Sequence, residues 1–445
     1  MGNNIFLFSF LLAELPSQLV SKKVGPDRWI PTQITLWSIV ALSQFALQGK
    51  STFYATRSLL GLLEGGFIPD IVLWLSYFYT SKELPIRLSF FWTTLSVTGI
   101  ITSLLAFAIL HLDGTLGHAG WRWLFLIEGL ITLVVGLTSF FMMPASAVQT
   151  KAWFRPNGWF TDREVGIVVN RVLRDDPSKG DMHNRQAITP RRLWNAAKDY
   201  NLWPIYALGI LIYIPVNPEG TYLTLSLRNL GFSTFNTNLL TIPSTAAGIA
   251  TLLGITWVSE RVNERSFIAM IQNIWALPCI IALRWWPGAN DASDAWGTFA
   301  LLTVLLSYPY CHAILVGWAS RNSNNVGSRS VSAALYNMSV QLGNIASNYV
   351  YRTDDAPLYH RGNTVLVILN LASIALFLFT KCFYMWINRR RDQKWAALSE
   401  DVSDSAAMVV PRELFTKMFT KQERADYIKT STDTGSIRMD FRYVH

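Results

Sequence analysis

Long apolar runs alternate with short polar connections along almost the whole chain. Eleven of these runs approach the roughly 20 residues that an α-helix needs to cross the hydrocarbon core of a bilayer. The runs cover residues 3–20, 29–48, 53–79, 88–110, 122–143, 202–222, 235–258, 266–286, 298–319, 331–350 and 364–387. The pattern therefore predicts an all-α polytopic membrane protein with 11 transmembrane helices.

Two polar segments divide these spans into unequal groups. We expect an N-terminal bundle of five spans in residues 1–143, a linker in 144–201, a C-terminal bundle of six spans in 202–387 and a polar tail in 388–445. Within the linker, Thr161 and Glu164 have capping-box spacing and the valines that follow share one face, which predicts an amphipathic helix on the membrane surface. Thr189 followed by Pro190 predicts a second helix start. Whether the linker is a simple tether or a gating element stays open.

Composition supports lipid as the solvent for these runs. Of 445 residues, 51% are hydrophobic and 15% are charged, which is too little charge for the surface of a soluble protein of this length. The formal net charge of +9 comes from Lys and Arg residues that collect in alternate connections, so it indicates topology rather than a nucleic-acid surface. The basic connections include the linker and the tail. We therefore expect a multi-pass plasma-membrane protein with both segments in the cytoplasm and Met1 outside.

The start of the chain is unusual for this layout. An odd number of spans with an external first residue is uncommon, and a symmetric six-plus-six carrier needs one more helix before residue 3. The first run has no basic leading region and contains Glu14, so we interpret it as a span and not as a signal peptide. We expect an opening helix to be missing, either from the gene model or from the protein.

The sequence gives no sign of an enzyme or a metal site. Cys279, Cys311 and Cys382 lie inside apolar runs without the spacing of a metal site, so we expect them to be small packing residues. A nucleotide-binding loop and a nucleophile–base pair at a recognisable spacing are both missing. We therefore expect no cofactor, no catalytic residue and a carrier that depends on an existing gradient.

Several motifs resemble one transporter family. They are RSLLGLLEGGFIPD at 57–70, GWRWLFLIEG at 120–129, YLTLSLRNLGFSTFNTNLLTIPS at 222–244, WASRNSNNVGSRS at 318–330 and YRTDDAP at 351–357. With these motifs the chain resembles the fungal anion:cation symporter branch of the major facilitator superfamily, which includes allantoate, nicotinate and pantothenate permeases. The resemblance implies a six-plus-six helix fold with a central cavity and proton-coupled uptake of a small organic anion. The family's first helix has no counterpart here.

Charged residues inside spans are the main candidates for a transport site, because they are costly in lipid unless they face a cavity or a partner. Arg57 and Glu64 share one helix face, about 10 Å apart along its axis. We expect Arg57 to hold a substrate carboxylate in a bidentate pair and Glu64 to carry the coupled proton. A structural ion pair is the alternative. Gly61 and Gly65 form a GxxxG motif, which we assign to helix packing.

The span 331–350 carries two stripes at helical spacing. One is made of the amides Asn337, Gln341, Asn344 and Asn348. The other, nearly opposite, is made of the small residues Ser339, Gly343 and Ser347. Because amides in lipid need partners, we expect the first stripe, with Asn337, Gln341 and Asn344, to contact substrate in the pathway and the second to pack. Interhelical hydrogen bonding of the amides is the alternative.

Further polar residues extend this candidate set. Glu14 and His312 are additional candidates for proton coupling. For Glu14, and for Glu128, we favour a structural pair with an arginine such as Arg122, and for His312 we favour packing.

Two further features suggest gates. Pro215 and Pro218 interrupt one span, which makes Asn217 and Glu219 candidate gating residues and Tyr222 a candidate substrate contact. The connections at 21–28 and 259–265 occupy matching places in the two halves with acid and base interleaved. We expect Glu260 and Arg261 of the second connection to stabilise one conformation of a rocking carrier.

The combined prediction is a proton-coupled secondary transporter with two pseudo-symmetric bundles of five and six helices and a site at mid-membrane. It would act as a monomer in the lipid bilayer, using a proton gradient to move a small anionic substrate by alternating access. An exporter of a fungal secondary metabolite and a non-transporting or truncated remnant are the two alternatives.

Overall fold

The computed structural model describes residues 2–80, 82–109, 112–175, 194, 197–286, 294–323, 326–355, 359–405 and 444. Within these ranges the chain is helical and contains no β-strand; a single antiparallel bridge joins Ala152 and Arg155. The second helix start predicted at Thr189 lies outside the described residues. The structure confirms the all-α fold class.

The first bundle is built from six α-helices and two short 3-10 helices, as far as the structure describes it. They are α1 (Gly2–Val24), α2 (Pro26–Ser43), η1 (Gln44–Ala46), α3 (Lys50–Glu64), α4 (Phe67–Ser76), α5 (Leu84–Ile109), η3 (Thr115–Gly117) and α6 (Gly120–Met142). The linker contributes α7 (Asp162–Asp175).

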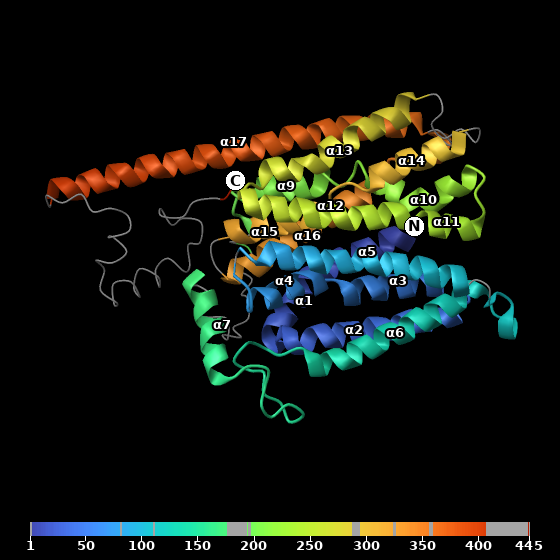
Figure 1. Cartoon of the computed structure of the whole chain (residues 1–445), viewed down its shortest axis with the longest axis horizontal. Coiled ribbons are helices and arrows are strands. Elements are labelled where there is room, and N and C mark those ends of the chain that lie inside the picture. Colours follow the sequence, from blue (N-terminus) through green and yellow to red (C-terminus); the bar gives the residue numbers. More distant parts are fainter. Residues whose placement is uncertain are drawn as a thin grey trace.

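The second bundle follows the linker. Its helices are α9 (Trp203–Leu211), α10 (Asn217–Asn229), α11 (Thr234–Leu240), α12 (Ile242–Val262), α13 (Ser266–Trp285), α14 (Ala295–Leu306), α15 (His312–Asn322), α16 (Val326–Ser347), η6 (Thr353–Asp355) and α17 (His360–Ser405). In Figure 1 the helices of the two bundles run roughly parallel in two adjoining groups, blue to cyan and green to orange.

Seven helices in the described chain are long and apolar enough to cross a membrane. They are Gly2–Ser21, Lys50–Ser76, Leu84–Ile109, Gly120–Met142, Asn236–Val262, Ser266–Trp285 and His360–Gln393. The remaining predicted spans coincide with α2, with α16 and with the broken pairs α9–α10 and α14–α15. These four segments are helical. They differ from the seven apolar spans because a helix break or polar residues lower their continuous apolar length.

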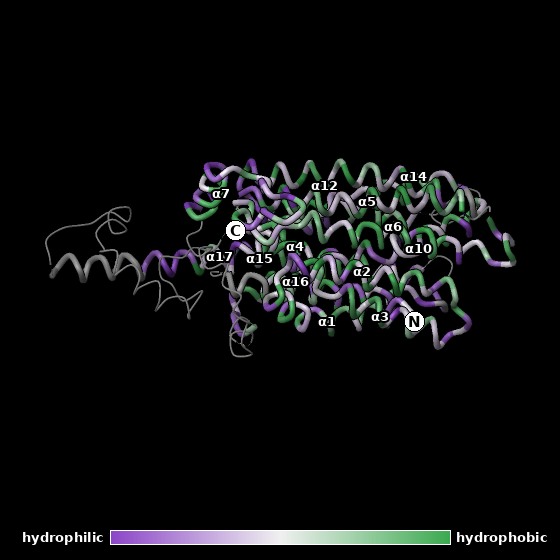
Figure 2. The backbone as a smooth tube through the Cα atoms, turned by 90° about the horizontal axis from the view of Figure 1, so that it is seen from below, coloured by the Kyte–Doolittle hydropathy of each residue, from purple (hydrophilic) through white to green (hydrophobic). Residues whose placement is uncertain are grey.

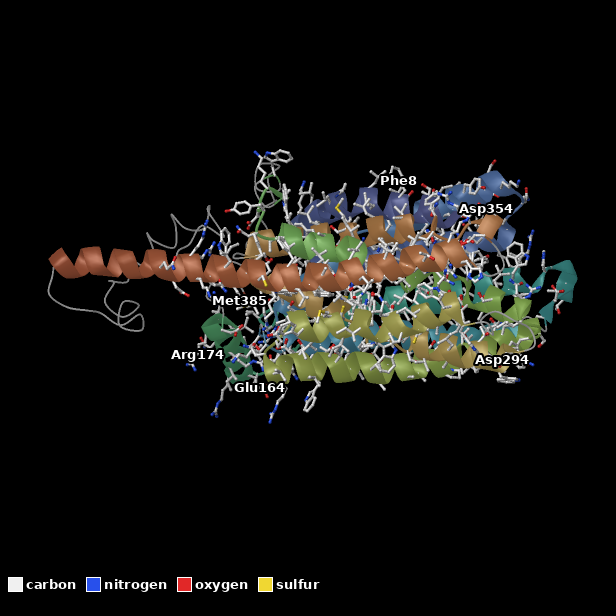
Figure 3. The ribbon with its side chains drawn as sticks, turned by 90° about the horizontal axis from the view of Figure 1, so that it is seen from above. Phe8, Glu164, Arg174, Asp294, Asp354 and Met385 are labelled. Atoms are coloured by element: carbon white, nitrogen blue, oxygen red, sulfur yellow. The ribbon has the colours of Figure 1, made fainter. Side chains whose placement is uncertain are left out.

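The outer surface of the bundles is apolar, as a lipid-facing surface should be. Val134 of α6 is 60% exposed and Phe379 of α17 is 58% exposed. Phe8 of α1 is also exposed and points away from the bundle in Figure 3. Large apolar side chains in contact with solvent are unfavourable in water but not in hydrocarbon, so the protein is a multi-pass membrane protein.

Polar segments gather at one end of the bundles, where α7 lies and where α17 extends beyond the other helices (Figures 1 and 2). We call this the linker end. The capping box predicted at Thr161 and Glu164 is present: the Thr161 backbone N–H donates to Oε2 of Glu164 at 2.8 Å. Hydrogen bonds from Thr161 lower the pKa of the exposed Glu164 carboxyl. Arg171 attaches α7 to the bundle through Glu83, at 2.9 Å, and the carbonyl of Phe78.

Two glycines produce the break between α3 and α4. Gly66 has a φ of 87°, a backbone conformation that side-chain-bearing residues avoid. The carbonyls released by the break find side-chain donors on neighbouring helices: Gln33 of α2 donates to Gly65, and Gln18 of α1 donates to Gly66. The broken helix is therefore held by buried amides.

In the second bundle, too, a buried side-chain amide binds the backbone groups released at the helix breaks. Proline interrupts both α9–α10, at Pro215, and α14–α15, at Pro309. Gln272 of α13 donates to the carbonyl of Ile212 at the first break and accepts from the backbone N–H of Cys311 at the second. One buried amide thus connects both breaks and fixes the residues within them near the middle of the bundle.

Candidate functional site

The candidate site lies where the two bundles meet. The first bundle presents α1, α4 and α5 at this boundary, and the second presents α12, α15 and α16. Glu14 lies ten residues before Val24, the end of α1. At 1.5 Å per residue it is roughly 15 Å from the linker end, about half the thickness of a bilayer core. The residues around Glu14 are therefore at mid-membrane.

Two acidic side chains are fully buried at this depth. Glu14 of α1 and Asp70 of α4 are each 0% exposed, and the charge of Asp70 acts on Glu14. Gln18, one turn after Glu14, donates from Nε2 to Oδ1 of Asp70 at 2.8 Å. Among the described residues, both carboxylate oxygens of Glu14 and Oδ2 of Asp70 have no hydrogen-bond partner. Buried carboxylates without partners are costly, which is typical of functional groups in membrane spans.

Asn337 brings the second bundle to this acidic pair. It belongs to α16, is 2% exposed and lies beside Glu14. Its Nδ2 donor nevertheless has no partner in the described part of the chain. The structure thus brings together Glu14 and Asn337, two residues that the sequence predicted for separate roles.

An aromatic cluster lies at the boundary between the two bundles. His312, at the start of α15, stacks on Tyr310 with ring centroids 5.6 Å apart and meets Trp92 of α5 edge-on at 4.4 Å. Nδ1 of His312 is 3.2 Å from the hydroxyl of Tyr213, which is itself 3.1 Å from the hydroxyl of Tyr336. Tyr213 and Tyr310 lie in the two helix breaks. The breaks therefore build a polar aromatic wall, and Trp92 reaches it from the other bundle.

Arg57 and Glu64 lie together on α3 but do not touch. Arg57 is half-buried, its guanidinium carbon is 5.2 Å from the centre of the Phe53 ring, and its charge acts on Glu64. Within the described residues no ion pair joins the two side chains. The N–H groups of the Arg57 guanidinium are consequently available to another acceptor. The adjacent Gly61 and Gly65 pack as the GxxxG motif predicts, because an added Cβ would lie 2.3 Å and 2.6 Å from the carbonyls of Phe6 and Phe10 on α1.

The amide stripe of Asn337, Gln341, Asn344 and Asn348 contacts the first bundle through a hydrogen bond at its Asn348 end. Asn348 donates to Asn4 of α1 at 2.7 Å, an interhelical bond between the bundles. Gln341 and Asn344 are half-buried, and Asn344 donates to Gln341 at 3.2 Å. The small-residue stripe packs, since a Cβ on Gly343 would lie 2.1 Å from the carbonyl of Ile210 in α9.

The predicted gating residues after the α9–α10 break are tied to neighbouring helices. Asn217 donates to Ser347 of α16, and Glu219, 6% exposed, accepts from the hydroxyl of Tyr351. Tyr222 is half-buried and shows no polar contact with the described residues. These contacts lie toward the end of the bundles opposite the linker end, away from the acidic pair.

The two predicted gating residues of the connection at 259–265 differ in their contacts. Glu260 contacts Arg265 at 2.9 Å and Arg321 of α15 at 3.0 Å, whereas Arg261 is exposed. Burial, followed by the neighbouring Arg321, lowers the pKa of Arg265, and Glu260 opposes both effects. The ion cluster therefore ties α12 to α15 within the second bundle.

The structural pairing suggested for Glu14 and Glu128 with Arg122 is wrong. Arg122 donates instead to the backbone carbonyls of Phe45 and Leu47, at 3.0 Å and 2.8 Å, where α2 and η1 end. The favourable interaction of an arginine with exposed carbonyls at a helix end explains this choice. Glu14 is left facing Asp70 and Asn337.

Sequence reasoning missed Asp70 and Gln18 as site residues. The signal was present, since Asp70 is a carboxylate inside an apolar run and is the last residue of the motif RSLLGLLEGGFIPD. What the run does not show is the partner: Gln18 is 52 positions away in the chain. Only the packing of α1 against α4 brings these side chains together.

The chain was compared with known proteins. The sequence family described as the Major Facilitator Superfamily matches residues 3–348. The chain belongs to this superfamily. Major facilitator proteins are transporters, so the chain is a transport protein and not an enzyme, as its apolar spans also indicate.

Relatives within the superfamily support this assignment. The uncharacterized transporter YIL166C of Saccharomyces cerevisiae is 41% identical over 447 residues, covering 100% of this chain and 78% of that protein. The MFS-type transporter cnsO of Penicillium expansum is 28% identical over 385 residues, covering 84% of this chain and 73% of that protein.

The fold also matches a solved superfamily structure. The proton:xylose symporter XylE, bound to 6-bromo-6-deoxy-D-glucose, has a TM-score of 0.65 and 13% sequence identity. The match covers 85% of this chain and 84% of that chain. At this identity the comparison shows a common fold, and it agrees with the two-bundle arrangement of helices.

Proposed function

We propose that this major facilitator protein is a proton-coupled transporter that moves a small organic anion by alternating access. The observation that carries the proposal is Arg57, a half-buried cation within a span whose guanidinium has no ion pair among the described residues. A charge within a span is costly in free energy unless an ion of opposite charge binds it during the transport cycle. A substrate carboxylate is such a partner, because it accepts two parallel hydrogen bonds from a guanidinium.

Further features support the proton and the amide contacts. Glu14, Asp70 and Glu64 supply carboxyl groups at mid-membrane, where a proton can be exchanged as the bundles move. Gln341 and Asn344 on α16 are half-buried and offer hydrogen bonds to a polar solute. His312 remains a candidate for proton transfer, and Tyr222 for substrate contact.

The resemblance of the chain to anion:cation symporters supports a carboxylate as the substrate. Nicotinate, pantothenate and allantoate each carry a carboxylate that fits the donors of Arg57. The protein would work as a monomer in the plasma membrane with the linker and the tail in the cytoplasm. The ion cluster around Glu260 and the contacts of Asn217 and Glu219 would stabilise individual conformations.

Uptake into proteoliposomes tests the proposal. Labelled nicotinate, pantothenate and allantoate are offered with and without an inward proton gradient, and accumulation of at least one should require the gradient. Arg57→Ala should reduce uptake by about tenfold or more, because hydrogen bonds to charged groups contribute about 1.5–3 kcal/mol. Arg228→Ala, at an exposed arginine of α10, is the matched control. Unchanged uptake by Arg57→Ala at equal reconstitution would refute the role of Arg57.

The direction of transport is tested in the same vesicles. Substrate that moves only when protons flow the opposite way would identify an exporter of metabolites. Lack of movement for every compound in the panel, with correctly folded protein, would contradict the proposed substrate class.

A further inference from the structure

We propose that Glu14 and Asp70 form one shared proton-binding site and that Asn337 closes this site from the second bundle. The inference rests on the proton coupling proposed above and assigns the proton to named atoms. It also gives α4 a role, through Asp70, that the sequence did not assign to it.

Burial is the first step. Both carboxyl groups are 0% exposed, and Gln18, one turn after Glu14 on α1, donates to Oδ1 of Asp70 on α4 at 2.8 Å. Two negative charges on packed helices, without water, repel each other and lose their hydration. At most one of the two groups is therefore ionised when the bundles are together, and the pair holds at least one proton.

Hydrogen bonding decides where that proton resides. Oδ1 of Asp70 accepts a 2.8 Å hydrogen bond from Gln18, and this donor stabilises the charged form of Asp70. Glu14 has no donor within hydrogen-bond geometry among the described residues. Glu14 is consequently the neutral member of the pair and Asp70 the ionised one.

The groups around Glu14 come from four neighbouring helices. α1 packs against α2, α3, α4 and α16. Asp70 of α4 is the charged group that acts on Glu14, and Asn337 of α16 is its polar neighbour. On α3, the charge that acts on Glu64 is that of Arg57. On α2, Gln33 donates to Ser17 and to carbonyls of the α3–α4 break.

Asn337 provides the connection to bundle movement. Its Nδ2 is buried, unpartnered in the described structure and adjacent to Glu14. An amide both donates and accepts, so it matches a protonated or an ionised carboxyl. When α16 moves away from α1, water reaches Glu14 and the proton can leave. Closure of the bundles then requires that the pair take up a proton again, which is the condition for coupling.

Infrared difference spectroscopy of the reconstituted protein tests the site without any substrate. A buried protonated carboxyl gives a C=O stretching band that shifts in D₂O. In a Glu64→Gln, Glu128→Gln, Glu219→Gln background, which removes other buried and half-buried carboxyls of the spans, the protein should show this band at neutral pH, and adding Glu14→Gln should abolish it. Asp70→Asn should keep the band but shift the pH at which it disappears by about one unit, as expected for coupled groups. Asn337→Val should shift the band frequency without removing the band.

Controls separate this site from other causes. Glu164→Gln, at the exposed carboxyl of α7, should leave the band unchanged. Size-exclusion profiles and thermal unfolding check that each variant folds. If Glu14→Gln does not fold, the shift in pH expected for Asp70→Asn tests the shared site independently. A spectrum of the triple-variant background without the band, or a band that persists when Glu14→Gln is added, overturns the shared site. Neither result bears on the Arg57 uptake test, so failure of one proposal is distinguishable from failure of the other.

Discussion

Gly343 marks the closest approach of α16 to α9. A Cβ at this position would lie 2.1 Å from the carbonyl oxygen of Ile210, which is backbone and cannot rotate away. Gly343→Ala should therefore force the helices apart and destabilise the fold by about 1–3 kcal/mol, the usual cost of overpacking. Thermal unfolding in detergent measures the loss. Gly254→Ala is the matched control, since no atom lies within 4 Å of its added Cβ. Equal stability of the two variants would contradict this packing.

Glu260 should be more important for stability than its neighbour Arg261. Arg265 is 2% exposed, so Glu260→Gln would leave a buried guanidinium without its carboxylate. Removing one partner of a buried ion pair typically costs about 3–5 kcal/mol, and the partial exposure of Arg321, 13%, argues for the lower part of this range. Arg261→Gln, at an exposed side chain, should change the unfolding temperature little. If the two variants unfold alike, the ion cluster contributes nothing measurable.

At the scale of elements, α7 is held by few contacts. Arg171 joins it to Glu83 and to the carbonyl of Phe78. The two side chains of the ion pair are exposed, Arg171 at 44% and Glu83 at 36%. Such exposed pairs contribute about 0.2–1 kcal/mol. Arg171→Ala should therefore raise hydrogen exchange of residues 162–175 by up to about fivefold, while Arg163→Ala should not. A helix whose exchange is unaffected by Arg171→Ala would be held by lipid or by other contacts.

The helices could largely be predicted from the sequence, but their breaks could not. Apolar length and lack of charge are properties of one segment, so they identify α5, α6 and α13 directly. The interruption at Pro215 was also predicted. The break at Pro309 was not, because one proline in an apolar run is compatible with a kinked helix. Whether the chain breaks depends on Gln272, which satisfies the released groups from another helix.

For the candidate site, too, individual residues could be predicted from the sequence, but their contacts could not. Arg57, Glu14 and Asn337 could be singled out because polar residues in spans are unusual. Their partners could not, because the pairing of Gln18 with Asp70 and of Glu14 with Asn337 depends on how helices from different parts of the chain pack. Arg122 illustrates the opposite error, since a nearby carboxylate in the sequence proved less favourable than the carbonyls at the end of α2.

At the scale of the whole molecule, the bundles touch at several depths. Near the linker end, Gly317 of α15 approaches Pro85 of α5. At mid-membrane, Trp92 meets His312, and farther along α5, Ser103 is 3.3 Å from Thr241. Alternating access requires that contacts at one end open while those at the other stay closed. The described conformation has both ends together.

Asn4 and Asn348 give a direct test of this movement. Their amides meet at 2.7 Å between α1 and α16, at the end of the bundles opposite the linker end. Cysteines at both positions, in a Cys382→Ser background, should be bridged by a short bis-methanethiosulfonate reagent, which spans the two side-chain lengths and holds the bundles together there through reducible bonds. Transport measured with the labelled carboxylates should then fall to background and recover after reduction, because separation of the bundles at this end is needed once per cycle.

A crosslink within one bundle separates this effect from simple damage. The hydroxyls of Ser9 and Ser58 are 2.9 Å apart, on α1 and α3 of the first bundle, which should move as a unit. Cysteines at these positions should crosslink as readily and leave transport unchanged. If the crosslink between bundles is tolerated as well, α1 and α16 stay together throughout the cycle, and the proton on Glu14 would have to leave by a route other than the opening of this contact.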